Sequence, residues 1–153
     1  MPLVELVEGR VFRLIRISAR FPPESDKPRV DDFEPSSADK ARAATKGISV
    51  LVSVFDCDRT TVAEGRVIRG PSPEGYLAFK IDIADIRNKR IPGSRDYLRI
   101  YEDPLDPPES NMPGADGHCG IDGLERPPQA QRQAFKNLRA ALCDCADPYD
   151  DGT

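Results

Sequence analysis

The stretch Ile48-Ser49-Val50-Leu51-Val52-Ser53-Val54-Phe55 decides the fold class. β-Branched residues dominate it, and successive side chains of an extended chain point to opposite faces. One face is then wholly apolar, and on the other Leu51 and Phe55 alternate with Ser49 and Ser53. Apolar residues on both faces predict a strand at a central position in a sheet.

Four further segments have strand patterns, and the sheet is expected to combine them with 48–55. The segment Tyr76 to Ile83 alternates most regularly, with its odd-numbered apolar residues facing inward. Glu8-Gly9-Arg10 is expected to close a hairpin between the first two strands. Connections shorter than a dozen residues favour antiparallel pairing. The four additional predicted strands are 3–7, 11–18, 76–82 and 97–101.

Helical patterns indicate two helices and leave a third segment open. In 129–146, apolar residues recur at helical spacing, as Phe135, Leu138, Leu142 and Cys145. A short helix over 37–46 is predicted from the capping-box pair Ser36 and Asp39 and from Gly47 at its end. The segment 61–69 fits a helix through Thr61 and Glu64, but its β-branched residues also suit a strand.

These elements predict a single α+β domain over residues 1–146 with a flexible acidic tail over 147–153. The sheet is expected to be small, mixed and mainly antiparallel, and to be packed by the C-terminal helix. The segment 103–128 contains six prolines and four glycines, so we expect no regular element in it. Its apolar residues Met112, Ile121 and Leu124 predict a long ordered loop instead.

Composition excludes some functions and suggests a compartment. The 153 residues carry a net charge of −4, which disfavours sequence-independent binding to nucleic acid. The N-terminus lacks a basic segment followed by an apolar run, and no apolar run is long enough to span a bilayer. We therefore expect a soluble, cytoplasmic, bacterial protein whose four cysteines are reduced thiols.

The loop 116–123 holds the candidate catalytic residues His118, Asp116, Cys119 and Asp122. His118 is the only histidine in the chain and could act as a general base. The three glycines of this loop would let backbone amides approach a ligand. A second interpretation remains open, in which glycines and aspartates only shape a crossing loop and His118 binds the backbone.

Metal and thiol chemistry receive less support from the residue spacing. Cys143 and Cys145 are two residues apart, which on a helix turns them about 200° away from each other. No metal and no cofactor are therefore expected. Cys57 lies between Asp56 and Asp58, whose negative charges disfavour a thiolate. Thiol redox sensing through Cys57 or Cys119 is the weakest hypothesis.

Two functional hypotheses remain, and the sequence leaves open whether the chain is an enzyme. The first is a non-catalytic accessory protein of a bacterial multi-protein system, which binds another protein through its proline-rich loops and the acidic segments 102–109 and 144–151. The alternative is a small hydrolase or transferase with His118 as general base and Cys119, or a serine from another segment, as nucleophile. It predicts that His118 lies in a cleft beside Asp56, Asp58, Asp116 or Asp122.

Overall fold

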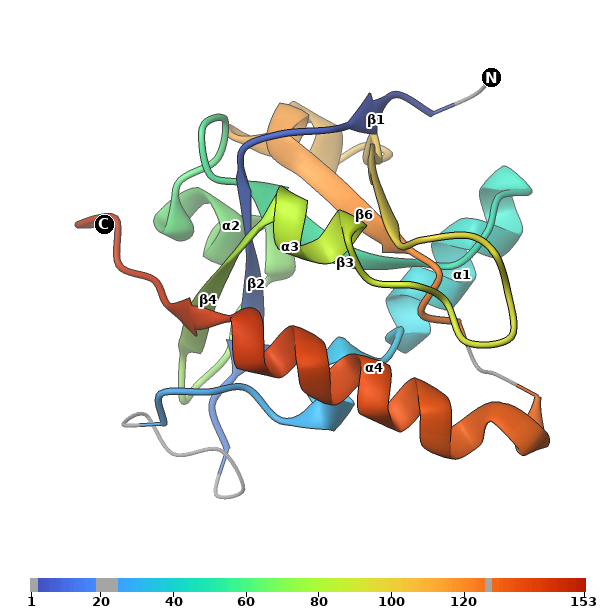
Figure 1. The fold of residues 1–153 in the computed structure, drawn as a ribbon. Coiled ribbons are helices and arrows are strands. Elements are labelled where there is room, and N and C mark those ends of the chain that lie inside the picture. Colours follow the sequence, from blue (N-terminus) through green and yellow to red (C-terminus); the bar gives the residue numbers. More distant parts are fainter. Residues whose placement is uncertain (1–2, 19–24, 126–127) are drawn as a thin grey trace.

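The computed structural model describes residues 3–18, 25–125 and 128–153. Within these ranges the chain forms an α+β structure with a seven-stranded sheet of order β1-β5-β6-β3-β2-β4-β7, in which every neighbouring pair is antiparallel (Figure 1). The strands are β1 (Glu5–Leu6), β2 (Arg10–Arg16), β3 (Leu51–Asp56), β4 (Tyr76–Asp82), β5 (Arg99–Glu102), β6 (His118–Asp122) and β7 (Asp147–Pro148).

Four α-helices accompany the sheet in the described ranges, and the predicted α+β class is confirmed. They are α1 (Ser37–Lys46), α2 (Val62–Arg69), α3 (Ile83–Arg87) and α4 (Arg132–Cys145). Single 3₁₀ turns are η1 (Val30–Phe33), η2 (Glu109–Asn111), η3 (Ala115–Gly117) and η4 (Gln129–Gln131). None of the helices seen in these ranges is both long and apolar enough to cross a membrane.

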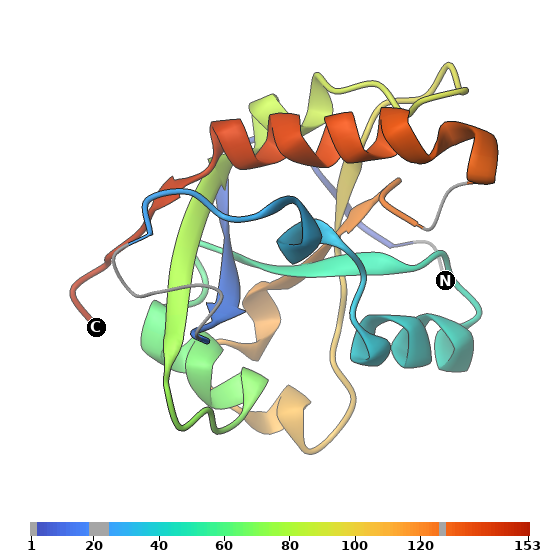
Figure 2. The ribbon, with the colours of Figure 1, turned by 90° about the horizontal axis from the view of Figure 1, so that it is seen from below.

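The strand β3 lies at the centre of the sheet, as its two apolar faces predict. Val52 and Val54 belong to the larger core, which α4 covers with the predicted stripe of Phe135, Leu138 and Leu142. Phe55 belongs to a smaller core on the opposite face. Figure 2 shows α4 on one side of the sheet and α1 and α2 on the other. The sheet is therefore covered on both faces at its centre.

Local capping explains where the helices on the α1 and α2 side begin. The Ser36 hydroxyl accepts the Asp39 N–H at 3.1 Å, and the Asp39 carboxylate accepts the Ser36 N–H at 2.9 Å, so the predicted capping box of α1 is confirmed. Thr61 and Glu64 make the same reciprocal pair at the start of α2. This capping box resolves the segment 61–69 as a helix.

Two expectations about the strands are wrong. β1 pairs with β5 rather than with β2, so Glu8-Gly9-Arg10 does not close a hairpin. The segment 103–128 does contain a regular element, because β6 lies between β3 and β5. The prolines of that segment lie at its two ends, and 114–126 contains none, so the backbone of β6 is free to pair.

The acidic tail makes defined contacts with the rest of the domain. β7 pairs with β4, and the Tyr149 ring centroid lies 5.6 Å from that of Phe12. The Asp151 carboxylate accepts the Val62 N–H at 2.7 Å, which caps the N-terminus of α2. The residues predicted to form a flexible tail thus lie against β4 and α2.

The central strands β2 and β3 separate after a short paired region. β2 pairs with β4 along its whole length, but it pairs with β3 only at Val11 and Phe12. Beyond this point, the Arg13 guanidinium donates to the Ser53 carbonyl at 2.6 Å and to the Asp32 carbonyl at 2.8 Å. The Arg69 guanidinium donates to the Leu14 carbonyl at 2.8 Å. Arginine side chains therefore replace the missing strand pairing.

Replacing Arg13 with methionine tests this role of the guanidinium. Arg13→Met keeps the aliphatic length but leaves the buried Ser53 carbonyl without its donor, so the free energy of unfolding should fall by about 2–4 kcal/mol. Urea unfolding measures the change. Arg10→Met, at the exposed start of the same strand, is the matched control and should change stability by less than about 0.5 kcal/mol. Equal losses in the two variants would contradict this role.

Candidate functional site

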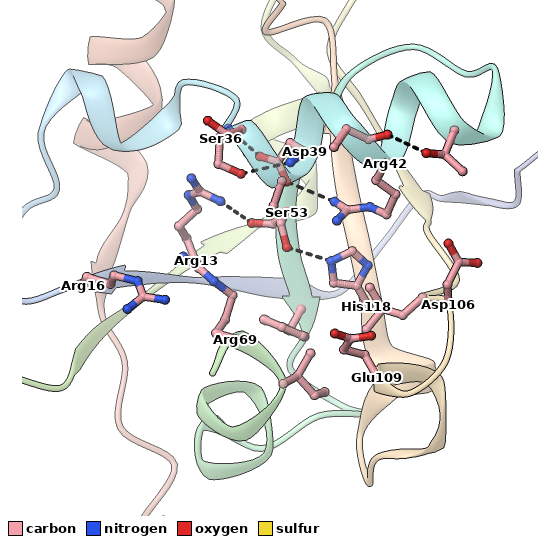
Figure 3. A pocket seen from close by; sticks show the side chains of 17 residues that line it. Arg13, Arg16, Ser36, Asp39, Arg42, Ser53, Arg69, Asp106, Glu109 and His118 are labelled. Atoms are coloured by element: carbon pink, nitrogen blue, oxygen red, sulfur yellow. Dashed lines mark hydrogen bonds and ion pairs between the residues drawn. The ribbon is translucent and has the colours of Figure 1, made fainter. Parts of the chain in front are cut away.

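A cleft of about 580 Å³ opens where β2 and β3 separate. Its walls come from β2, β3, β6, α1, α2 and the segment that precedes η2. Figure 3 shows the arginines of β2 and α2 on one side of the cleft and His118, Asp106 and Glu109 on the other. The cleft is thus lined by polar and charged side chains although it adjoins the smaller core.

His118 begins β6 and lies opposite Phe55 of β3. Its ring is 3% exposed, and its Nδ1 lies 2.6 Å from the Asp103 carbonyl oxygen. A carbonyl oxygen can only accept, so Nδ1 carries the proton and Nε2 has a free lone pair. Nε2 lies 2.7 Å from the Ser53 hydroxyl, which therefore donates to it. The surroundings of His118 select one tautomer, with an acceptor nitrogen facing Ser53.

The charge state of His118 is set mainly by burial. The pKa of His118 is lowered from 6.5 to about 4, mainly by burial and to a smaller extent by the neighbouring Arg42 guanidinium. The carbonyl and carboxylate of Asp103 and the carboxylate of Asp39 act in the opposite direction. His118 is therefore a neutral imidazole near pH 7.

The helix α1 positions the charges behind His118. Arg42 donates to the Asp103 carboxylate at 2.9 Å and to the Asp39 carboxylate at 3.0 Å. Lys46 adds a second cation 3.4 Å from Asp103, whose carboxylate lies 3.7 Å from His118 Nδ1. Asp39 is also the capping-box residue of α1, so the same side chain begins the helix and holds Arg42. Asp39, Arg42, Lys46 and Asp103 are thus paired with one another.

Arg13, Arg16 and Arg69, which we call the arginine cluster, differ from Arg42 in lacking an acidic partner. None of the three forms an ion pair with a carboxylate in the ranges that the structure describes. Burial and the neighbouring Arg69 lower the pKa of Arg13 to about 10. Burial also lowers the pKa of Arg69. The arginine cluster is a concentrated positive charge in a protein of net charge −4.

Tyr76 supports two members of the arginine cluster. The guanidinium carbons of Arg16 and Arg69 lie 5.4 and 5.6 Å from the centre of its ring. The electron-rich face of an aromatic ring attracts cations over this range. Tyr76 therefore offsets part of the repulsion between two guanidinium groups while leaving their hydrogen-bonding edges free of carboxylates.

None of the other predicted site residues is a hydrogen-bond partner of the His118 ring among the described contacts. Asp116 lies in η3 and lines a neighbouring cavity of about 340 Å³ with Arg59, Glu102 and His118. Cys119 points to the larger core, and burial raises its pKa to about 12. Asp122, at the end of β6, lines a different hollow. The hydrogen bonds of His118 go instead to Ser53 and Asp103.

Two glycines of the loop 116–123 allow close packing against neighbouring side chains. A Cβ on Gly117 would collide with the side chain of Thr60, and one on Gly120 would collide with that of Leu51. Side chains of the chain itself occupy the space that the glycines leave. At these two positions glycine allows β6 and η3 to approach their neighbours closely.

Thiol and metal chemistry have little structural support in the described residues. Burial raises the pKa of Cys57 to about 11, although the Tyr149 hydroxyl and Arg10 act in the opposite direction. No three His, Cys, Asp or Glu side chains among the residues the structure describes lie close enough to hold a metal ion. The cleft of the arginine cluster, Ser53 and His118 is the strongest candidate site.

Sequence analysis missed Ser53, Asp103 and the arginine cluster. A signal was present for two of them, because Ser53 and Arg13 are polar residues inside segments that otherwise read as buried strands. Nothing local marked Asp103, which lies in a proline-rich segment and reaches His118 only through the pairing of β5 and β6. Contacts between distant segments therefore define this site.

The buried neutral state of His118 predicts a pH-dependent stability. The folded-state pKa lies below the unfolded value, so the unfolded chain binds an extra proton between about pH 6.5 and pH 4. The contribution to stability is therefore complete above pH 6.5 and is lost as the pH falls, by about 3 kcal/mol at pH 4 and below.

Urea unfolding of the wild type and of His118→Gln from pH 7.5 to 4 measures this loss. His118 is the only histidine, so the difference between the two pH profiles isolates its titration from that of the carboxylates. The wild-type profile should fall more steeply below pH 6.5. Parallel profiles would show that burial does not hold His118 neutral.

Comparison with known proteins gives no relative for this chain. No protein family, curated protein sequence or solved structure matches it. Its function must therefore be inferred from the cleft, with its arginine cluster and its Ser53–His118 pair.

Proposed function

We propose that the chain binds a small anionic ligand, with a carboxylate or phosphate group, in the cleft between β2, α1 and α2. The observation that carries this proposal is the arginine cluster, in which Arg13, Arg16 and Arg69 line one cleft and form no ion pair with any carboxylate of the described residues. A carboxylate or phosphate accepts charge-assisted hydrogen bonds from guanidinium groups, often from two N–H groups at once.

The contrast with the other arginines near the cleft supports the proposal. Arg42 bridges Asp39 and Asp103, and Arg59 bridges Asp56 and Glu102. The chain has 26 acidic residues, so partners for arginine are abundant. The three guanidinium groups donate to backbone carbonyls, but no carboxylate within the described ranges forms an ion pair with them. A bound anion would supply the missing negative charge.

The acidic wall of the cleft, which faces the arginine cluster, would determine the orientation of the ligand. Asp106 and Glu109 line it, and neither forms an ion pair within the described residues. Their negative charges repel an anion and so favour its placement at the arginine end. Figure 3 shows the two carboxylates across the cleft from Arg13 and Arg16. The rest of the ligand would extend toward this wall.

The hypothesis of an accessory protein that binds another protein stays a prediction. The proposed site is a concave cleft lined by charged groups. Such a cleft is better suited to binding a small ligand than to binding another protein. A hydrolase or transferase, the alternative hypothesis, would use the same cleft.

Isothermal titration calorimetry with inorganic phosphate and, separately, with succinate tests the proposal and distinguishes the two anionic groups. Arg16→Gln and Arg69→Gln should each weaken binding of the preferred anion by about tenfold, because each removes a charge-assisted hydrogen bond. Arg16 is exposed, so its variant should fold normally.

The matched control is Arg66→Gln, which removes the same charge from an exposed position on α2. Its affinity should equal that of the wild type. If Arg66→Gln and Arg69→Gln weaken binding equally, the effect reflects net charge alone and the proposal fails. Absence of binding of both anions by the wild type would also overturn it.

A further inference from the structure

Ser53 and His118 lie in the same cleft as the arginine cluster, and the anion-binding proposal does not use them. We propose that Ser53 is a nucleophile and His118 its general base in the hydrolysis of a carboxylic ester that bears an anionic group. The inference rests on the proposed function, because the arginine cluster would hold the anionic group beside the reacting ester.

The geometry between the two side chains is that of an activated nucleophile. Ser53 Oγ lies 2.7 Å from His118 Nε2, within the distance over which a base takes a proton directly. The Asp103 carbonyl, 2.6 Å from Nδ1, fixes the tautomer in which Nε2 is the acceptor. Ser53 is 9% exposed and lines the cleft in which the ligand would bind.

The charges that face His118 suit a base that is neutral at rest. Near pH 7 the buried ring is unprotonated and can accept the Ser53 proton. The Asp103 carboxylate, 3.7 Å from Nδ1, then stabilises the imidazolium. Asp39 adds to this effect, whereas Arg42 opposes it. The base is therefore available without prior deprotonation.

The arginine cluster lies next to the nucleophile. The Arg13 guanidinium donates to the carbonyl oxygen of Ser53 itself, which brings a buried positive charge to the reacting residue. Positive groups fixed near a developing oxyanion lower the barrier to acyl transfer. The same charges would hold the anionic part of the substrate, so that binding and reaction occur at adjacent positions.

The proposed reaction has two steps and consumes one water molecule. Ser53 Oγ bonds to the ester carbonyl carbon while its proton passes to His118 Nε2. The bond from that carbon to the alcohol oxygen breaks, and His118 returns the proton to the leaving alcohol. Water then attacks the acyl group on Ser53, gives a proton to His118, and releases the acid as the Ser53 hydroxyl forms again.

Two measurements on the full chain test the inference. Incubation with a fluorophosphonate followed by peptide mass spectrometry should place the adduct on Ser53. In a chromogenic assay, 4-nitrophenyl hemisuccinate should be hydrolysed with a kcat/KM about tenfold above that of 4-nitrophenyl butyrate, a neutral ester of the same acyl length. This preference should shrink in Arg16→Gln.

Ser53→Ala should lower hydrolysis by about a hundredfold or more and abolish the adduct, because it removes the nucleophile. Ser49→Ala, at an exposed serine that precedes β3 and lies outside the lining of this cleft, is the matched control and should leave both unchanged. The rate of the wild type should rise as the pH increases through about 4 and then stay level, as His118 becomes neutral. Urea unfolding of each variant checks that it is folded.

The outcomes separate the two proposals. If the wild type binds phosphate or succinate but forms no adduct and hydrolyses neither ester, the catalytic inference is overturned and the anion-binding proposal stands. An adduct on another residue, or full activity of Ser53→Ala, also overturns it. If Ser53 reacts but neither anion binds and the neutral ester is hydrolysed equally well, the pair is catalytic and the anion-binding proposal fails.

Discussion

The hydrogen bond from the Arg13 guanidinium to the Ser53 carbonyl is the contact on which the cleft depends. In an uninterrupted antiparallel sheet that carbonyl would accept a backbone N–H from the neighbouring strand. Because the side chain of Arg13 takes this place, β2 and β3 can separate after Phe12 and Phe55 without leaving the carbonyl unpaired. The side chain of Arg13 also brings a positive charge into the interior of the protein. The opening in the sheet and the charge of the cleft thus have one cause.

A series of contacts connects the capping of α1 to the tautomer of His118. Asp39 caps α1 and binds Arg42, Arg42 binds Asp103, and the Asp103 backbone fixes the tautomer of His118. Each link is a buried charged or polar group with at least one partner, as low-polarity surroundings require. The arrangement of the site is therefore tied to the folding of a helix that does not touch the imidazole directly.

The elements of the fold that could be predicted are those whose signal is local. The central strand was evident from the two apolar faces of 48–55, and α1 and α4 were evident from capping residues and helical spacing. β6 was not predicted because the segment 103–128 is rich in proline and glycine, although its prolines lie at its two ends and leave a short buried strand between them. The extent of β2–β3 pairing could not be predicted either, since it depends on whether a side chain from within the strand supplies the missing donor.

The candidate site was harder to predict than the fold because its residues are far apart in the sequence. His118 was identified because it is the only histidine, but its expected partners were Asp56, Asp58, Asp116 or Asp122, with Cys119 or a serine from another segment as nucleophile. In a strand, neighbouring side chains point to opposite faces, so Cys119 faces the larger core while His118 faces the cleft. The residues that reach His118 belong to β3, which pairs with β6, and to the segment after β5, which pairs with β6 on its other side. Once β6 is recognised as a strand between these two, the contact of Ser53 and Asp103 with the imidazole follows from the sheet order.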